Sequence, residues 1–98
     1  MYFAIANELI DVAEAAGDYK HIERVARTLL RYDVLNDYYH SLVIQALGEQ
    51  GRQPERAEWF RIVTNRYQGE GLDVPERLVK INARYTPRTG GRRGNTAT

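Results

Sequence analysis

Residues 17–40 read Gly-Asp-Tyr-Lys-His-Ile-Glu-Arg-Val-Ala-Arg-Thr-Leu-Leu-Arg-Tyr-Asp-Val-Leu-Asn-Asp-Tyr-Tyr-His. This stretch contains a segment with helical spacing of apolar residues, and a helix-breaking segment lies on each side of it. Gly17 is expected to end one helix, and Asp18 to cap the next by accepting a hydrogen bond from a free backbone N–H. Residues 33–37, in which Asp33, Asn36 and Asp37 are polar, form the second helix break. Apolar residues resume helical spacing from Tyr39. The stretch therefore predicts two antiparallel helices joined by a tight turn, and then a third helix.

Upstream, residues 2–16 predict a helix with a wide apolar face. Because this face covers nearly half of the helix, we expect its outer part to contact another domain or subunit. The stripe expected to be buried is Tyr2, Ile5, Leu9, Val12 and Ala16, widened by Phe3, Ala6 and Ile10.

Downstream, helices are expected at residues 37–50 and 54–69 and again after Asp73. Asp73, Pro75 and Glu76 follow the order of an N-cap acceptor, a first-turn proline and the acid of a capping box. The sequence therefore predicts five helices.

The helix at residues 19–32 is expected to turn Glu23, Arg24, Arg27 and Arg31 towards water. Trp59 and Ile62 broaden the apolar face of the fourth helix. Other apolar residues that these four helices are expected to bury are Ile22, Val25, Ala26, Leu29, Tyr39, Leu42, Val43, Ala46, Leu47, Ala57, Phe60, Val63, Tyr67, Leu78, Val79, Ile81 and Tyr85.

The chain also contains an internal repeat. Gly17 and Gly51 lie 34 residues apart, as do Ala13 and Leu47, and each glycine closes one helix before its partner begins. This is the helix-turn-helix period of tetratricopeptide repeats. The sequence therefore predicts an all-α fold, a tetratricopeptide-like right-handed stack of two helical hairpins plus a C-terminal capping helix. Because such stacks usually need about three repeats, we expect part of a larger assembly or a self-associating unit.

Length and composition narrow the functional classes. Ninety-eight residues make one small domain, and the absence of cysteine excludes disulfides and thiolate metal sites. No apolar run is long enough to span a membrane, and the first residues lack the basic region of a signal peptide. We expect a cytoplasmic protein with no membrane contact.

Charge is unevenly distributed along the chain. Residues 1–76 contain eight Lys and Arg and all thirteen Asp and Glu, a net charge of −5, whereas residues 77–98 contain six Lys and Arg and no acid. The last residues, 87–98, are too poor in apolar side chains to offset their ordering entropy. The expected organisation is a helical domain at 1–86 followed by a disordered basic tail.

Several motifs follow one another in residues 5–82. They are Leu29-Leu30, Asp33-Val34-Leu35, Asn36-Asp37 and His40, then Gly51-Arg52, Ala57 and Phe60, then Tyr67, Gly71-Leu72-Asp73 and Pro75. Their order resembles the bacterial transcriptional activator domain, a tetratricopeptide-like module that follows a winged-helix DNA-binding domain in many bacterial activators. Val34 stands where that family has proline. No winged helix precedes the motifs within this sequence, so the resemblance implies protein–protein contact in transcription regulation, without DNA binding by this chain.

Catalytic and metal chemistry find little support in the sequence. His21 and His40 have no second ligand at metal-binding spacing, and Ser41 is not in a nucleophile context. We expect His40 to be partly buried and to bond a carbonyl of the preceding turn, with a pH-sensitive contact as the alternative. Residues 89–94 lack the strand, lysine and helix of a phosphate loop. No enzyme activity, cofactor or metal is expected.

Three surfaces are candidates for partner binding. An acidic groove on the first and third helices suits a basic peptide, although a merely solvated face would carry the same residues. Exposed apolar ends of the stack would contact another subunit or domain. Arginines of the tail would follow a phosphate backbone, or the tail is a solvated linker. The groove residues are Asn7, Asp11, Glu14, Tyr38, Ser41, Gln45 and Glu49; the apolar ends are Phe3, Ile10, Trp59 and Ile62; the tail residues are Arg88, Arg92 and Arg93.

The leading functional hypothesis is a protein–protein interaction and dimerisation module of a transcription regulator whose DNA-binding domain lies elsewhere. The first alternative is a free-standing adaptor that binds a basic peptide in the acidic groove. The third is nucleic-acid binding through the arginine-rich tail.

Overall fold

The computed structural model describes the backbone of residues 2–86 and the side chains of residues 8–86, and this part of the chain is all-α. Five helices are present, as predicted, and none of them is long and apolar enough to cross a membrane. Their bounds are α1 (Tyr2–Ala16), α2 (Tyr19–Leu30), α3 (Asp37–Glu49), α4 (Gln53–Gly69) and α5 (Glu76–Tyr85).

The turns after α1 and α3 have the same geometry. Gly17 and Gly51 both have positive φ, +72° and +73°, which is the left-handed conformation that glycine adopts without steric cost. The N–H of the following residue then bonds a carbonyl of the last helical turn, from Asp18 to Ala13 at 2.8 Å and from Arg52 to Leu47 at 3.0 Å. The 34-residue repeat in the sequence therefore corresponds to a repeated backbone conformation at these two turns.

Side-chain caps start α2 and α3. The Asp18 carboxylate accepts a hydrogen bond from the His21 N–H at 3.2 Å, which confirms the predicted N-cap. Asn36 performs the same role for α3 by accepting from the Tyr39 N–H at 3.0 Å. Helix α5 differs, because Pro75 is its N-cap residue and no side chain caps it. The prediction that Asp73 caps this helix was therefore wrong.

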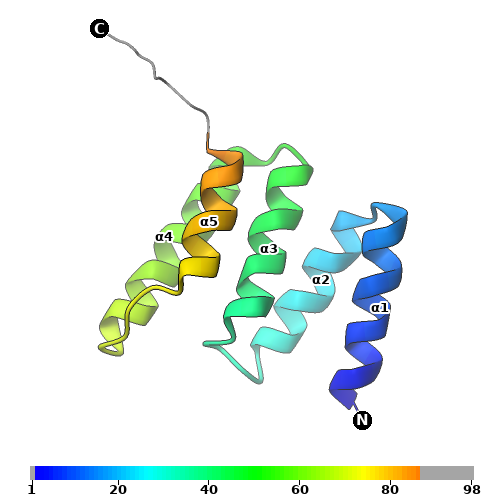
Figure 1. Ribbon diagram of the computed structural model, residues 1–98, viewed down its shortest axis with the longest axis horizontal. Coiled ribbons are helices and arrows are strands. Elements are labelled where there is room, and N and C mark those ends of the chain that lie inside the picture. Colours follow the sequence, from blue (N-terminus) through cyan, green and yellow to red (C-terminus); the bar gives the residue numbers. More distant parts are fainter. Residues whose placement is uncertain (1, 87–98) are drawn as a thin grey trace, which may run out of the picture.

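Helix α3 is the centre of the fold. It packs against α2 on one side and against α4 and α5 on the other, whereas α1 contacts α2 and no other helix of the described part of the chain (Figure 1). The core has two parts, one formed by α1, α2 and α3 and one formed by α3, α4 and α5. Fully buried residues of α3 serve both parts: Val43 and Leu47 belong to the first, and Ile44 belongs to the second.

The buried face of α1 is not the predicted one. Ile10 is completely buried and Ala13 is 5% exposed, so these residues form the contact with α2. Leu9 and Val12, which were expected in the core, are 49% and 68% exposed. Two overlapping apolar stripes fit the helical period of this segment, and the single neighbour of α1 covers only one of them. Ile10 is therefore a core residue and does not form an exposed apolar end.

Helices α4 and α5 also bury fewer apolar residues than predicted. Leu78 is completely buried, but Val79 is 47% exposed and Ala57 is exposed. Helix α5 contacts α3 and α4 only, so one side of it faces solvent.

Glu23, which was expected to face water, is 8% exposed. Its carboxylate accepts hydrogen bonds from Arg52 at 2.7 Å, from Gln50 at 3.1 Å and from Arg27 at 2.9 Å. Burial raises the pKa of this carboxyl, but the bonds from Gln50 and Arg27 and the charges of Arg27 and Arg52 outweigh it, so the pKa lies below its ordinary value. Glu23 thereby ties α2 to the turn between α3 and α4.

Gly48 allows a close approach between α3 and α5. A Cβ atom at this position would lie 2.4 Å from the ring of Tyr85, which therefore rests against the glycine backbone. The Tyr85 hydroxyl donates to the Glu49 carboxylate at 2.6 Å. Burial and this hydrogen bond together raise the pKa of Tyr85 to about 12. The last turn of α5 therefore packs against α3 at Gly48, and the hydrogen bond to Glu49 fixes it there.

We expect Glu23→Gln to lower the free energy of unfolding by about 1.5–3 kcal/mol, because hydrogen bonds from charged donors to a buried carboxylate are lost. Glu55→Gln is the matched control, since the exposed Glu55 also pairs with Arg52. Its effect should be negligible because exposed ion pairs contribute little. Urea denaturation at pH 7 measures both, and equal effects of the two substitutions would contradict the structural role of Glu23.

We expect Gly48→Ala to destabilise the protein by about 1–3 kcal/mol, the usual cost of overpacking, because the new methyl group displaces the Tyr85 ring. Gly69→Ala, at a helical position with open space around it, should instead stabilise by about 0.5–1 kcal/mol. Urea denaturation followed by circular dichroism compares them. Stabilisation by both substitutions would mean that Tyr85 does not pack on Gly48.

Candidate functional site

The predicted acidic groove is only partly assembled. Burial is the main cause that raises the pKa of Tyr38, and the negative charges of Glu14 and Asp11 raise it further. The three predicted residues therefore influence one another electrostatically. The guanidinium of Arg77 on α5 lies 5.5 Å from the centroid of the Tyr38 ring and 3.8 Å from the Asp37 carboxylate. A cation therefore stands beside the acidic residues of the groove.

Other groups of this groove are occupied within the fold. The Ser41 hydroxyl donates to the Tyr38 carbonyl at 2.6 Å, and Glu49 accepts from Tyr85. Gln45 is half-buried on the same helix. The side chain of Asn7 lies outside the described residues. These contacts leave fewer free polar groups for a partner than the sequence alone indicated.

The predicted apolar ends have different outcomes. The side chain of Phe3 lies outside the described residues, and Ile10 is in the core. Trp59 and Ile62 lie together on α4, where Trp59 is half-buried and Ile62 is 46% exposed. Three further predicted residues, Arg88, Arg92 and Arg93, lie outside the described part of the chain.

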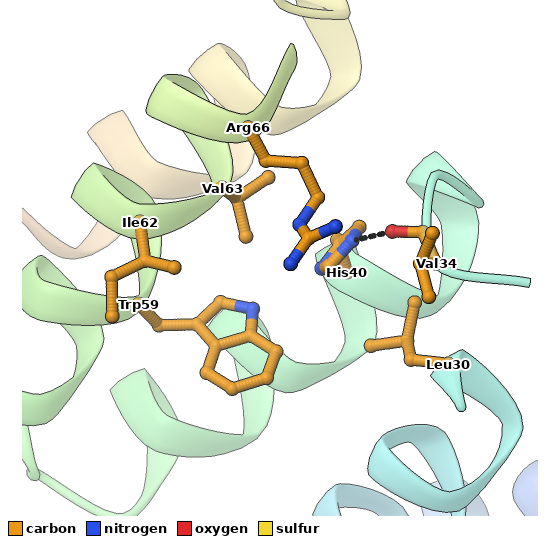
Figure 2. A pocket seen from close by; sticks show the side chains of 7 residues that line it. All are labelled: Leu30, Val34, His40, Trp59, Ile62, Val63 and Arg66. Carbon is orange, nitrogen blue, oxygen red and sulfur yellow. Dashed lines mark hydrogen bonds between the residues drawn. The ribbon is translucent and has the colours of Figure 1, made fainter. Parts of the chain in front are cut away.

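Trp59 and Ile62 line a cavity of about 160 Å³, which we call the Trp59 cavity. It opens between the end of α2, the start of α3 and the middle of α4 (Figure 2). Most of its wall is aliphatic, with one imidazole, one indole and one guanidinium. Its lining residues are Leu30, Val34, His40, Trp59, Ile62, Val63 and Arg66.

His40 forms the inner wall of the Trp59 cavity. It is 5% exposed, and its Nε2 lies 2.7 Å from the Val34 carbonyl, which confirms the predicted bond to the preceding turn. Since a carbonyl only accepts, Nε2 carries the proton and Nδ1 of the neutral ring is an acceptor. Burial lowers the pKa of His40, and the bond to Val34 offsets part of this effect.

Two buried polar atoms of the cavity have no hydrogen-bond partner among residues 8–86. These are Nδ1 of His40, an acceptor, and Nε1–H of Trp59, a donor. The two rings have centroids 5.9 Å apart and are tilted by 51°, and Figure 2 shows the indole nitrogen on the side of the cavity that holds His40 and Arg66. The wall of the cavity therefore contains one donor and one acceptor that are closed to solvent and have no partner among the described residues.

Arginines lie on the α2 side of the cavity. The Arg27 guanidinium lies 4.5 Å from the centroid of the Trp59 ring. An adjoining cavity shares Trp59 and is lined by Arg24, Arg27, Thr28 and Arg31. We call the two cavities together the Trp59 groove. Four arginines and no carboxylate line it. Glu55 and Glu58, in contrast, which pair with Arg52 and Arg61, line a further neighbouring cavity that shares Arg27, Trp59 and Ile62.

Few polar side chains line the Trp59 cavity. The Trp59 cavity includes no carboxylate or hydroxyl among its lining side chains. Within the described residues, no three His, Cys, Asp or Glu side chains are grouped closely enough to hold a metal ion. The sequence indicated Trp59 and Ile62 as an apolar surface and His40 as a partly buried ring. It carried no signal that they would line one groove with the arginines of α2.

We expect the stability of the protein to fall as the pH falls below about 6.5, in part because of His40. Its pKa is lower in the folded state, so the unfolded chain binds a proton that the folded chain excludes. His40→Gln removes this contribution and keeps a donor for the Val34 carbonyl. Urea denaturation between pH 7.5 and 5.0 should show a smaller loss for the variant, by about 1.4 kcal/mol for each unit between the two pKa values. Parallel curves would show that burial leaves His40 unperturbed.

Comparisons with known proteins complete this description. No protein-family model, curated protein or solved structure matches the chain.

Proposed function

We propose that this chain is a protein-interaction module that dimerises through the exposed apolar stripe of α1. The observation that carries the proposal is the exposure of Leu9 and Val12, at 49% and 68%. They lie one turn apart on a face of α1 next to the face that packs on α2. The sequence places Tyr2, Ile5 and Ala16 at the same helical positions.

The position of α1 in the fold supports a partner on this side. Helix α1 is at one edge of the helical array and contacts only α2 (Figure 1). An edge helix with an apolar outer stripe is what a repeat unit exposes when its neighbour is missing. Two such stripes from two copies would cover each other in a symmetric interface.

A tetratricopeptide-like stack of two hairpins and a capping helix is our proposal for the architecture. Its support is the repeated turn geometry at Gly17 and Gly51 and the contact of α2 with α3, which joins the first hairpin to the second. We further propose that the module belongs to a cytoplasmic transcription regulator with a separate DNA-binding domain and itself performs no catalysis. Support for this role is the resemblance of residues 5–82 to the bacterial transcriptional activator domain.

A second candidate function is an adaptor that holds a basic peptide in the acidic groove. The charges of Asp11 and Glu14, which help to raise the pKa of Tyr38, favour it, because negative charge near an aromatic ring suits a lysine or arginine side chain. Arg77 over the same ring would have to move aside. For this reason we rank dimerisation first.

We expect the chain of residues 1–98 to form a dimer in light scattering across a concentration series. Val12→Asp should raise the dissociation constant at least tenfold, or about 1.4 kcal/mol, because it introduces a charge into the interface. Val79→Asp is the matched control, since Val79 is a similarly exposed valine on α5. Circular dichroism verifies that both variants are folded. A monomer at every concentration would contradict dimerisation and favour the acidic groove.

A further inference from the structure

We propose that the Trp59 groove binds an acidic peptide segment of a partner protein, with one bulky apolar side chain of that segment inside the Trp59 cavity. This surface lies on α2, α3 and α4 and is separate from the α1 stripe to which dimerisation is assigned. Size, hydrogen-bonding groups and charge each point to this ligand.

The size and the apolar lining of the cavity indicate that the ligand contributes one bulky apolar side chain. Its volume is about 160 Å³, and its walls include Leu30, Val34, Ile62 and Val63. An engineered apolar cavity of roughly 150 Å³ holds one benzene molecule, so this space suits one Leu, Ile, Met or Phe side chain. Val34 and Ile62 are each 46% exposed, which leaves the mouth accessible from solvent.

The unpartnered nitrogen atoms of Trp59 and His40 indicate that the ligand has a peptide backbone. Nε1–H of Trp59 donates and Nδ1 of His40 accepts, and both are buried without a partner among the described residues. A peptide unit presents one acceptor, its carbonyl, and one donor, its N–H. Both atoms are closed to solvent in this structure, so an entering peptide has to displace the side chains around them before its backbone can satisfy them; burial then makes these two bonds valuable.

The arginines of the Trp59 groove favour acidic residues on either side of the apolar side chain of the ligand. Arg24, Arg27 and Arg31 follow one another at helical spacing along α2, and Arg66 of α4 lines the adjoining Trp59 cavity. Within residues 8–86, no carboxylate lies within ion-pair distance of Arg24, Arg31 or Arg66. Arginine pairs favourably with carboxylates, often through two parallel hydrogen bonds. The C-terminal segment of this chain is a poor occupant, because residues 87–98 contain arginines and no acid.

A peptide is favoured over a single-stranded nucleic acid, the other polymer that arginines and an aromatic ring attract. Base stacking needs a free aromatic face, but Arg27 lies over the Trp59 ring and is itself bonded to Glu23. The aliphatic walls also match an aliphatic or phenyl side chain better than a base.

Trp59 provides a specific probe, because it is the single tryptophan of the chain. We would titrate ¹⁵N-labelled protein with short synthetic peptides that have one central Leu or Phe among Asp and Glu residues. The expected result is a shift of the Trp59 indole N–H resonance with a dissociation constant below about 1 mM. Peptides with central Ser, or with Lys flanks, should bind at least tenfold more weakly.

Variants test the site itself. Arg66→Glu should weaken binding of the acidic peptide at least tenfold. Arg84→Glu should leave it unchanged; it is the matched control because both arginines lie in the last turn of their helices. Arg31→Glu replaces Arg66→Glu if the latter loses helical circular dichroism. Val12→Asp should not affect binding, so this test is independent of dimerisation.

Three results would overturn the proposal. The first is no shift of the Trp59 indole resonance with any acidic peptide. The second is equal binding to the Arg66→Glu and Arg84→Glu proteins. The third is a shift produced by single-stranded oligothymidine, with steep salt dependence, in the absence of any shift by the peptides; the groove would then be a nucleic-acid site.

Discussion

The burial of α3 on two sides is the constraint on which the rest of the structure depends. Its apolar residues belong to both parts of the core, with Val43 and Leu47 on the side of α2 and Ile44 on the side of α4 and α5. Three helices therefore share one central helix, and α1 is joined to it only through α2. Outside α3, the two parts of the core also meet at Trp59 of α4, which packs against both of them.

The Trp59 groove is a consequence of the same arrangement. Helices α2 and α4 both pack on α3, and they meet each other only through long side chains such as Arg27 and Trp59, which line cavities between the two helices. His40 comes from α3 and forms the inner wall, held by its bond to Val34. Trp59 reaches over it from α4. A binding surface is thus formed where the helical packing is incomplete.

The buried carboxylate of Glu23 links fold and surface. It accepts a bond from Arg27, whose guanidinium lies over the Trp59 ring, and another from Arg52 in the turn before α4. The position of the arginine beside the groove is therefore coupled to the junction between the two hairpins. Opposite charge appears at the acidic groove, where the charges of Asp11 and Glu14 act on Tyr38. The two surfaces consequently suit ligands of opposite charge.

The sequence by itself determined the five helices and their breaks, because glycines at positive φ, caps such as Asp18 and helical apolar spacing are local properties of the chain. It also predicted the bond of His40 to the preceding turn. Tertiary structure decided which of two apolar stripes of α1 is covered, because that depends on the single neighbour of the helix. It also buried Glu23, placed Tyr85 on Gly48, and gathered Trp59, His40 and the arginines along the Trp59 groove. Each of these contacts joins residues of different helices, and their partners cannot be identified from spacing within one helix.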